Sequence, residues 1–248
     1  MDESYLKMFE AFRNYGNYDE VFADALSKIG KDVRLGSVRS CLSIGPGKGQ
    51  WEIEFLKHCG ANISKFLAVE RDHASAEYLR KSLTTGLPGV ESQVFETDIR
   101  NWEGLSDPVD LILIFHSLYL VEASDRQELF KKVHDRWSSS GGYVAIAHAS
   151  RTKSRHSAEK IFERLGSPTV TWEDVEADMQ KAGFTKHHVH EMLMTKEFAN
   201  PDESLLRFLR MHVKAPVTLD DVRDAAKELY GEGKADEFNI LAIFKRTY

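Results

Sequence analysis

The segment Gly45–Gly49, with the sequence GPGKG, alternates glycine with other residues. Glycines at a turn between a strand and a helix let the backbone approach a ligand closely, and the first N–H groups of the helix are free to bind polar atoms. Glu70 follows about 20 residues later in the sequence. This is the spacing of the carboxylate that accepts the hydroxyls of a ribose in nucleotide-binding folds. Asp98 ends the next apolar segment and would face the adenine edge. These residues predict a ligand that contains a nucleoside.

The glycine spacing distinguishes two kinds of cofactor site. A dinucleotide-binding turn has the pattern G-x-G-x-x-G, whose third glycine would fall here on Gln50. The observed G-x-G-x-G, followed by one acid after the second strand and another after the third, resembles the turn of S-adenosylmethionine-dependent methyltransferases. We therefore favour a methyltransferase over a nicotinamide-dependent oxidoreductase.

Short apolar segments alternate with amphipathic ones along most of the chain, as in a parallel sheet with covering helices. The apolar run 110–116 predicts a strand in the middle of the sheet, buried on both faces. Ser124 and Gln127 form a capping-box pattern that predicts the start of a helix over 125–137, and a turn is expected over 138–142. The expected strands are 38–45, 66–70, 92–98, 110–116, 143–149, 186–193 and 238–244, and the other expected helices are 50–58, 75–83, 172–182, 202–213 and 219–231.

Aromatic residues recur every three or four positions near the N-terminus and would share one face of a helix. They are Tyr5, Phe9, Phe12, Tyr15, Tyr18 and Phe22. One interpretation is that this aromatic stripe packs on the rest of the domain. The other is that it covers a pocket, where the ring faces would attract an organic cation.

The composition of the 248 residues excludes several classes of protein. Hydrophobic residues make up 42% and charged residues 29%, as in ordinary globular domains, and no apolar run approaches the ~18 residues of a membrane span. The net charge of −6, with one short basic segment at 151–155, argues against nucleic acid as a partner. Cys41 and Cys59 suggest no disulfide framework, and the histidines at 187–190 lack a third well-spaced metal ligand. The acidic N-terminal sequence leads us to expect a cytoplasmic protein with no membrane contact.

Several segments resemble the histamine N-methyltransferase family. They are LSIGPGKGQWEIEFL, AVERDHASAE, ETDIRNW, IFHSLYLVEA and FNILAIF, and the resemblance extends over most of the chain. It implies an α/β fold with a Rossmann-like, seven-stranded methyltransferase sheet, an antiparallel last strand, helices on both faces and a small discontinuous helical substrate cap. It also implies S-adenosyl-L-methionine as the cofactor and S-adenosyl-L-homocysteine as the product.

The resemblance assigns two sets of residues by position. The cofactor would contact Gly45, Pro46, Gly47, Gly49, Glu70, Arg71, Ser75, Asp98, Ile99 and Phe115. The substrate pocket would be lined by Phe9, Phe12, Tyr18, Asp19, His116, Tyr119, Phe162 and Asn239. The chain departs from the family at Tyr18, where the family has a substrate carboxylate, although Asp19 is adjacent. In addition, His116 replaces a glutamine and Ala158 replaces a tryptophan, so the identity of the acceptor stays open.

His116 is the candidate catalytic residue, because an imidazole can accept a proton or orient an acceptor by a hydrogen bond at neutral pH. The alternative is that it only fills a polar position beside the cofactor. Methyl transfer from a sulfonium requires alignment and an acceptor lone pair, so we expect no metal.

We expect residues 38–193 and 238–248 to form the cofactor-binding domain, with a helical cap made of 1–37 and of an insertion at 194–237. The expected enzyme is a cytoplasmic monomer that N-methylates a small amine or imidazole compound. One alternative is a methyltransferase that acts on a protein or nucleic acid docked at 151–155. The other is a non-catalytic protein that binds S-adenosylmethionine.

Overall fold

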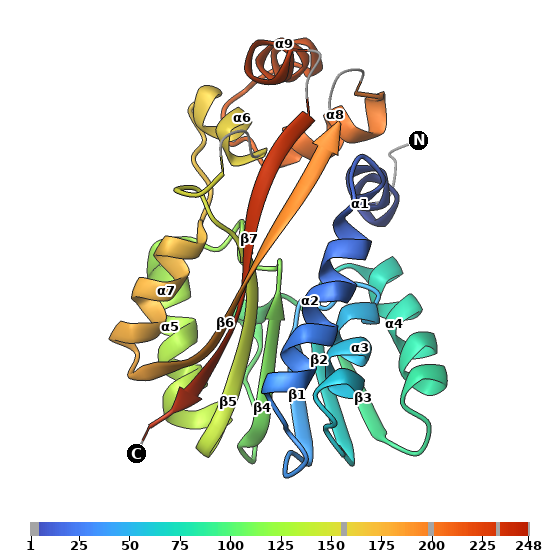
Figure 1. Cartoon of the computed structure of the whole chain (residues 1–248), viewed down its shortest axis with the longest axis vertical. Helices are drawn as coiled ribbons and strands as arrows, with labels where there is room; N and C mark the ends of the chain where they lie inside the picture. Colours follow the sequence, from blue (N-terminus) through green and yellow to red (C-terminus); the bar gives the residue numbers. More distant parts are fainter. Residues whose placement is uncertain (1–4, 155–157, 198–200, 232–233, 248) are drawn as a thin grey trace.

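The computed structural model describes residues 5–154, 158–197, 201–231 and 234–247. Its centre is a seven-stranded sheet in the order β3-β2-β1-β4-β5-β7-β6 (Figure 1). The strands are β1 (Ser40–Ile44), β2 (Lys65–Glu70), β3 (Glu91–Glu96), β4 (Val109–Phe115), β5 (Ser138–Ala149), β6 (Phe184–Glu197) and β7 (Lys234–Arg246). The strands β1 to β5 are parallel, and β7 runs antiparallel to both of its neighbours. The predicted α/β fold with an antiparallel last strand is confirmed, and β4 lies in the middle of the sheet as expected.

Helices cover both faces of the sheet. They are α2 (Tyr18–Asp32), α3 (Gln50–His58) and α4 (His73–Gly86) on one face, and α5 (Ala123–Lys132) and α7 (Trp172–Lys181) on the other. Successive side chains of a strand point to opposite faces. In β4, Leu111 and Leu113 therefore join the core under α2 to α4, while Ile112 and Ile114 join the core under α5 and α7. This double burial explains the unbroken apolar sequence of β4.

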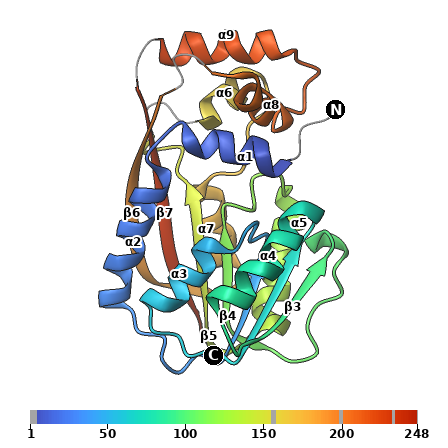
Figure 2. The same ribbon diagram turned by 90° about the vertical axis from the view of Figure 1, so that its right-hand side faces the viewer.

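A second group of helices lies beyond the carboxyl ends of the parallel strands. It consists of α1 (Tyr5–Asn14), α6 (Ala158–Arg164), α8 (Glu203–Met211) and α9 (Leu219–Tyr230). Figure 2 shows α1 between the sheet and the other three helices. The strands β6 and β7 are longer than predicted and reach this group, so 194–197 and 234–237 are strand residues rather than part of a helical insertion. The division into a cofactor-binding domain and a cap stays a prediction.

The aromatic stripe falls on two helices rather than one. The first, α1, ends at Asn14 and α2 begins at Tyr18, while Gly16 between them pairs with Lys196 of β6. A Cβ atom at Gly16 would lie 2.4 Å from the carbonyl oxygen of Thr195, so a larger residue could not approach β6 this closely. The break lets α1 turn over the strand ends while α2 packs along the sheet.

Two local expectations between β4 and β6 are wrong. The helix α5 begins at Ala123 without a side-chain cap, so Ser124 lies inside the helix rather than at its start. A π-helix at 133–137 follows α5 and leads directly into β5, whose first residues replace the expected turn at 138–142. The pairing of β4 with β5 shifts register between Val109 and Leu111, and this bulge accommodates the serines and glycines that suggested a turn.

No helix in the described ranges is long and apolar enough to cross a membrane.

Candidate active site

The glycine turn joins β1 to α3 at the carboxyl edge of the sheet. Gly45, Gly47 and Gly49 all have positive φ angles, of 65°, 56° and 75°. A Cβ atom at Gly45 would come within 2.6 Å of the Cβ of Ser117, and one at Gly49 within 2.3 Å of Cδ1 of Leu79. Glycine is therefore needed at these two positions both for the backbone conformation and for space.

Glu70 ends β2 beside the glycine turn and is almost fully buried. Its carboxylate accepts hydrogen bonds from the backbone N–H groups of Gly47 and Asp72, each at 2.9 Å. Burial raises the pKa of the Glu70 carboxyl, and the two backbone hydrogen bonds oppose this shift. Each oxygen keeps a further lone pair, so a firmly oriented carboxylate can accept the two hydroxyls of a ribose.

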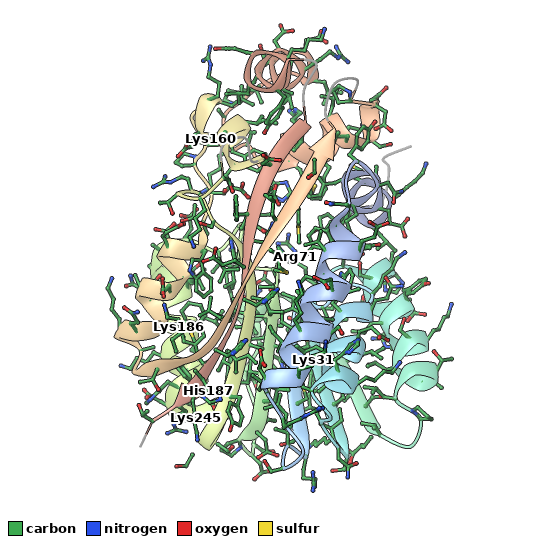
Figure 3. The ribbon with its side chains drawn as sticks, viewed as in Figure 1. Lys31, Arg71, Lys160, Lys186, His187 and Lys245 are labelled. Atoms are coloured by element: carbon green, nitrogen blue, oxygen red, sulfur yellow. The ribbon has the colours of Figure 1, made fainter. Side chains whose placement is uncertain are left out.

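Asp98 follows β3 and begins a short 3₁₀ helix, Ile99–Asn101. It accepts hydrogen bonds from Arg100, at 2.9 Å from the backbone N–H, 2.9 Å from Nε and 2.7 Å from Nη2. The side-chain hydrogen bond from Arg100 is the main reason that the pKa of Asp98 falls to about 2. Nη1 of Arg71 lies 3.9 Å from the same carboxylate, at the strand ends below the cap helices (Figure 3). Asp98 is thus an ionised acceptor whose charge is balanced by arginines.

A cavity of about 650 Å³ lies between this edge of the sheet and the helices α1 and α8. The volume falls in the range of ~300–1,000 Å³ that is typical of small-molecule sites. Its lining includes all the predicted cofactor residues, namely Gly45, Pro46, Gly47, Gly49, Glu70, Arg71, Ser75, Asp98, Ile99 and Phe115. It also includes the predicted substrate residues Phe9, Tyr18, Asp19, His116 and Tyr119. Two small ligands can therefore meet in one space, although the contacts of the individual residues stay predictions.

Three predicted substrate residues do not line this cavity. Phe12 packs on the ring of Phe208, with centroids 4.7 Å apart, and Phe162 stacks on His212 at 5.4 Å. Asn239 is fully buried in β7, and its Nδ2 donates to Oε1 of Glu237 at 3.1 Å. All three lie behind the cavity wall, where the cap helices meet the extended part of β6 and β7.

His116 lies at the carboxyl end of β4 with a φ angle of 53°, a left-handed conformation that is uncommon for a residue other than glycine. Its Nδ1 is 2.7 Å from the hydroxyl of Tyr119, and its Nε2 is buried without a hydrogen-bond partner. Burial lowers the pKa of His116 well below 6.5, and the nearby Lys196 and Arg13 add to this shift. The ring is therefore neutral at pH 7, with one nitrogen held by Tyr119.

Sequence patterns did not point to two ionisable residues of the cavity wall, Arg13 and Glu52. The guanidinium carbon of Arg13 lies 4.9 Å from the ring centroid of Trp51 and 5.2 Å from that of Tyr18. Glu52 is 1% exposed, and burial raises the pKa of its carboxyl to about 8. Arg13 belongs to the same helix as the first aromatic residues of the stripe, so the cation that faces these rings is part of the protein itself.

The histidines at 187–190 are remote from this cavity. Figure 3 places His187, with Lys186 and Lys245, near the end of the molecule opposite the cap helices. Among the residues that the structure describes, no group of three His, Cys, Asp or Glu side chains could hold a metal ion.

Comparisons with known proteins point to methyltransferases. A family model for a methyltransferase domain matches residues 13–189, and no curated protein sequence matches the chain. A proposed methyltransferase from Bacillus halodurans C-125 has a similar structure, with a TM-score of 0.64 and 13% identity over 91% of this chain and 100% of the other. The N-methyltransferase NodS from Bradyrhizobium japonicum WM9, in complex with S-adenosyl-L-homocysteine, is also similar. Its TM-score is 0.54, with 14% identity over 90% of this chain and 86% of the other.

A third similar structure is the geranyl diphosphate C-methyltransferase from Streptomyces coelicolor A3(2), in complex with Mg²⁺, geranyl-S-thiolodiphosphate and S-adenosyl-L-homocysteine. Its TM-score is 0.54, with 12% identity over 90% of this chain and 76% of the other. At such low identities these structures show a shared fold. The fold, the glycine turn and Glu70 define a class I S-adenosylmethionine-dependent methyltransferase. Because the family model matches residues 13–189, more than half of the chain, the chain belongs to the methyltransferase domain family.

The residues of the cavity fit S-adenosylmethionine as the cofactor. Glu70 provides a fixed carboxylate for ribose hydroxyls, Asp98 an ionised acceptor, and the glycine turn a close approach of backbone. The cofactor, when bound, supplies a methyl group on a positively charged sulfur, which an aligned lone pair can displace. The chain itself must bind and orient the acceptor and exclude water.

Proposed function

We propose that this methyltransferase transfers the methyl group to a nitrogen of a small amine or imidazole compound, which enters the cavity as a neutral molecule. The observation that carries the proposal is the continuity of the cavity. The predicted cofactor residues line the same cavity as His116 and Tyr119, and α1 also contributes to its lining. The lone pair of the acceptor nitrogen would displace a neutral thioether from the methyl group. In an imidazole the proton is then lost to solvent from the other ring nitrogen, whose N–H would be oriented by Nε2 of His116.

Electrostatics supports a neutral acceptor. The guanidinium of Arg13 already lies over the ring faces of Tyr18 and Trp51, so these faces are not free to attract a cationic acceptor. An imidazole, with a pKa of ~6.5, has a free lone pair at pH 7, whereas an aliphatic amine with a pKa of ~10 must first be deprotonated. His116 is neutral in this structure and its lowered pKa makes it a weak base, so its role would be to orient the acceptor N–H by a hydrogen bond.

The surface around 151–155 gives less support to a macromolecular acceptor. Arg151 forms an ion pair with Glu163 at 2.8 Å, and Lys153 pairs with Glu191. Arg155, the third cation of the proposed docking segment, lies outside the described residues. Since two of the three cations already have partners, this segment is a weak candidate for a phosphate-binding surface.

The test is a methyl-transfer screen at pH 7 over imidazoles, pyridine-type heterocycles and biogenic amines, with S-adenosyl-L-homocysteine as the readout. We expect turnover with imidazole-type acceptors, and turnover of aliphatic amines only at higher pH. His116→Asn should lower kcat about 100-fold with little effect on cofactor binding, and His187→Asn, remote from the cavity, should not change it. The proposal is wrong if only protein or nucleic acid substrates give product above the acceptor-free rate.

We also propose a monomeric cytoplasmic enzyme. The cavity is covered by α1 and α8 of the chain itself, so a monomer is the simplest arrangement. Cys41 and Cys59 are free, buried thiols, which suits a reducing compartment.

A further inference from the structure

Arg13 and Glu52 bring a cationic side chain and an ionisable carboxyl group to the wall of the cavity, from two different helices. The side chain of Arg13 is 12% exposed, and its Nε is buried without a hydrogen-bond partner. Its Nη2 pairs with Asp19, which is largely exposed to solvent. Oε1 of Glu52 is 3.4 Å from the hydroxyl of Ser43, and Oε2 is buried without a partner. Because a buried polar group without a partner is costly, both residues have unused capacity for a ligand.

The aromatic rings restrict how Arg13 can bind. Its guanidinium carbon lies over the rings of Trp51 and Tyr18, at 4.9 and 5.2 Å from their centroids. Ring faces attract the flat face of a guanidinium, so its N–H edge is the part that remains for hydrogen bonds. An edge with parallel N–H groups is the geometry that a carboxylate prefers.

The position of Glu52 relates the pair to the glycine turn. Glu52 lies in the first turn of α3, directly after Gly45–Gly49, and Ser43 lies in β1 directly before it. Glu70, at the other side of the turn, is close enough for its charge to add to the shift of the Glu52 pKa. A ligand held by Glu70 at one end can therefore extend past the turn to Glu52 and Arg13.

We infer that Arg13 and Glu52 form a subsite for an α-amino-acid group, with the carboxylate bound by Arg13 and the ammonium bound by Glu52. The cofactor carries such a group at the methionine end, and an acceptor that is itself an amino acid would carry one too. The inference concerns binding only, so it does not depend on the proposed acceptor.

Two ligands separate this subsite from the rest of the cavity. S-adenosyl-L-homocysteine and 5′-methylthioadenosine share the nucleoside and the thioether, but only the first carries the amino-acid group. By titration calorimetry, Arg13→Gln should weaken S-adenosyl-L-homocysteine by about 10-fold or more and 5′-methylthioadenosine by less than about 2-fold. Glu52→Gln should act in the same direction. Lys7→Gln, which removes an exposed cation from the same helix, should change neither affinity.

Proton release gives an independent readout of Glu52. The charged or titratable groups that act on it are Arg13 of α1, Tyr18 of α2, Cys41 of β1 and Glu70 of β2, with the Ser43 hydroxyl as its hydrogen-bond partner. With a pKa of about 8, Glu52 is mostly protonated at pH 7, and an arriving ammonium would favour its ionised form. Calorimetry in buffers of different ionisation enthalpy should show net proton release with S-adenosyl-L-homocysteine and none with 5′-methylthioadenosine. Glu52→Gln should abolish this release.

The binding measurements distinguish a subsite for the acceptor from a purely structural role of Arg13 and Glu52. If Arg13→Gln leaves S-adenosyl-L-homocysteine unchanged but raises the KM of an amino-acid acceptor about 10-fold, the subsite exists and serves the acceptor. If both variants change the two nucleosides by the same factor, or change neither ligand nor acceptor, Arg13 and Glu52 are structural and the inference is wrong. Where only S-adenosyl-L-homocysteine or the acceptor is affected, retained binding of 5′-methylthioadenosine shows that the variant is folded.

Discussion

The acidic residues at the strand ends already have hydrogen-bond partners. Glu70 is held by two backbone N–H groups, and Asp98 by the backbone and guanidinium of Arg100. A cofactor bound at these residues, as we predict, would meet acceptors that are oriented in advance, which reduces the entropy lost on binding. His116 differs, because one of its ring nitrogens is unpartnered and buried. At the scale of single residues, the site combines two firmly oriented carboxylates, Glu70 and Asp98, with a buried imidazole nitrogen of His116 that has no hydrogen-bond partner.

Glu70→Gln tests the first of these carboxylates. The amide nitrogen of glutamine cannot accept a hydrogen bond, so the variant must lose either a ribose contact or a backbone contact. We expect the affinity for S-adenosyl-L-homocysteine to fall by about 10-fold or more, equivalent to ~1.4 kcal/mol, measured by calorimetry. Glu77→Gln, on the exposed face of α4, is the matched control. A decrease much below 10-fold would mean that Glu70 does not bind the ribose.

At the scale of elements, the placement of α1 determines whether the cavity has a roof. No residue of α1 is fully buried, and the helix contacts α8 mainly through aromatic rings, such as Phe9 with Phe208 at 5.9 Å. Its position is set where it joins α2, because Gly16 pairs with Lys196, and Oδ1 of Asn17 accepts from the N–H of Thr195 at 2.8 Å. The roof thus depends on a backbone contact with β6 more than on its own burial.

Gly16→Ala should displace α1, which covers the cavity, without changing the residues at the strand ends. The added methyl group would meet the Thr195 carbonyl oxygen at 2.4 Å and Cγ of Lys196 at 2.9 Å, so α1 must move away from β6. We expect a loss of ~1–3 kcal/mol in the free energy of unfolding, measured in urea, and weaker binding of S-adenosyl-L-homocysteine. Gly36→Ala, whose Cβ would lie 3.8 Å from the nearest atom, should have little effect. Equal effects of the two variants would argue against a special role of the contact.

At the scale of the whole molecule, the sheet and the cap helices share a buried polar centre. Nζ of Lys196 is 2.9 Å from Oε2 of Glu237 and 3.6 Å from the ring centroid of Phe12. Both charged side chains are at least 95% buried. The ion pair joins the extended ends of β6 and β7, and the ring contact links them to α1. One interior therefore runs from the sheet into the cap.

Lys196→Met should be strongly destabilising, because it leaves the Glu237 carboxylate buried without its counter-charge, although the hydrogen bond from Asn239 remains. We expect a loss of ~3–5 kcal/mol in the free energy of unfolding, and recovery of most of it in the double variant Lys196→Met/Glu237→Leu. Urea unfolding measures both values. Lys153→Met is the control, since its ion pair with Glu191 is exposed and should contribute less than ~1 kcal/mol. A small loss in Lys196→Met would show that water reaches this centre.

The sequence by itself determined the class of fold and predicted which residues meet at the strand ends. The glycine turn, Glu70 and Asp98 follow consecutive strands, and parallel strands bring their carboxyl ends to one edge. Local chemistry was sufficient there, because each residue is placed by the strand that precedes it. Tertiary structure decided the rest. The break at Gly16, the approach of Arg13 to Glu52 and the Lys196–Glu237 pair join segments far apart in the chain. Such contacts have no local periodicity, so only the folded chain shows which charges meet in the cavity and which remain without a partner.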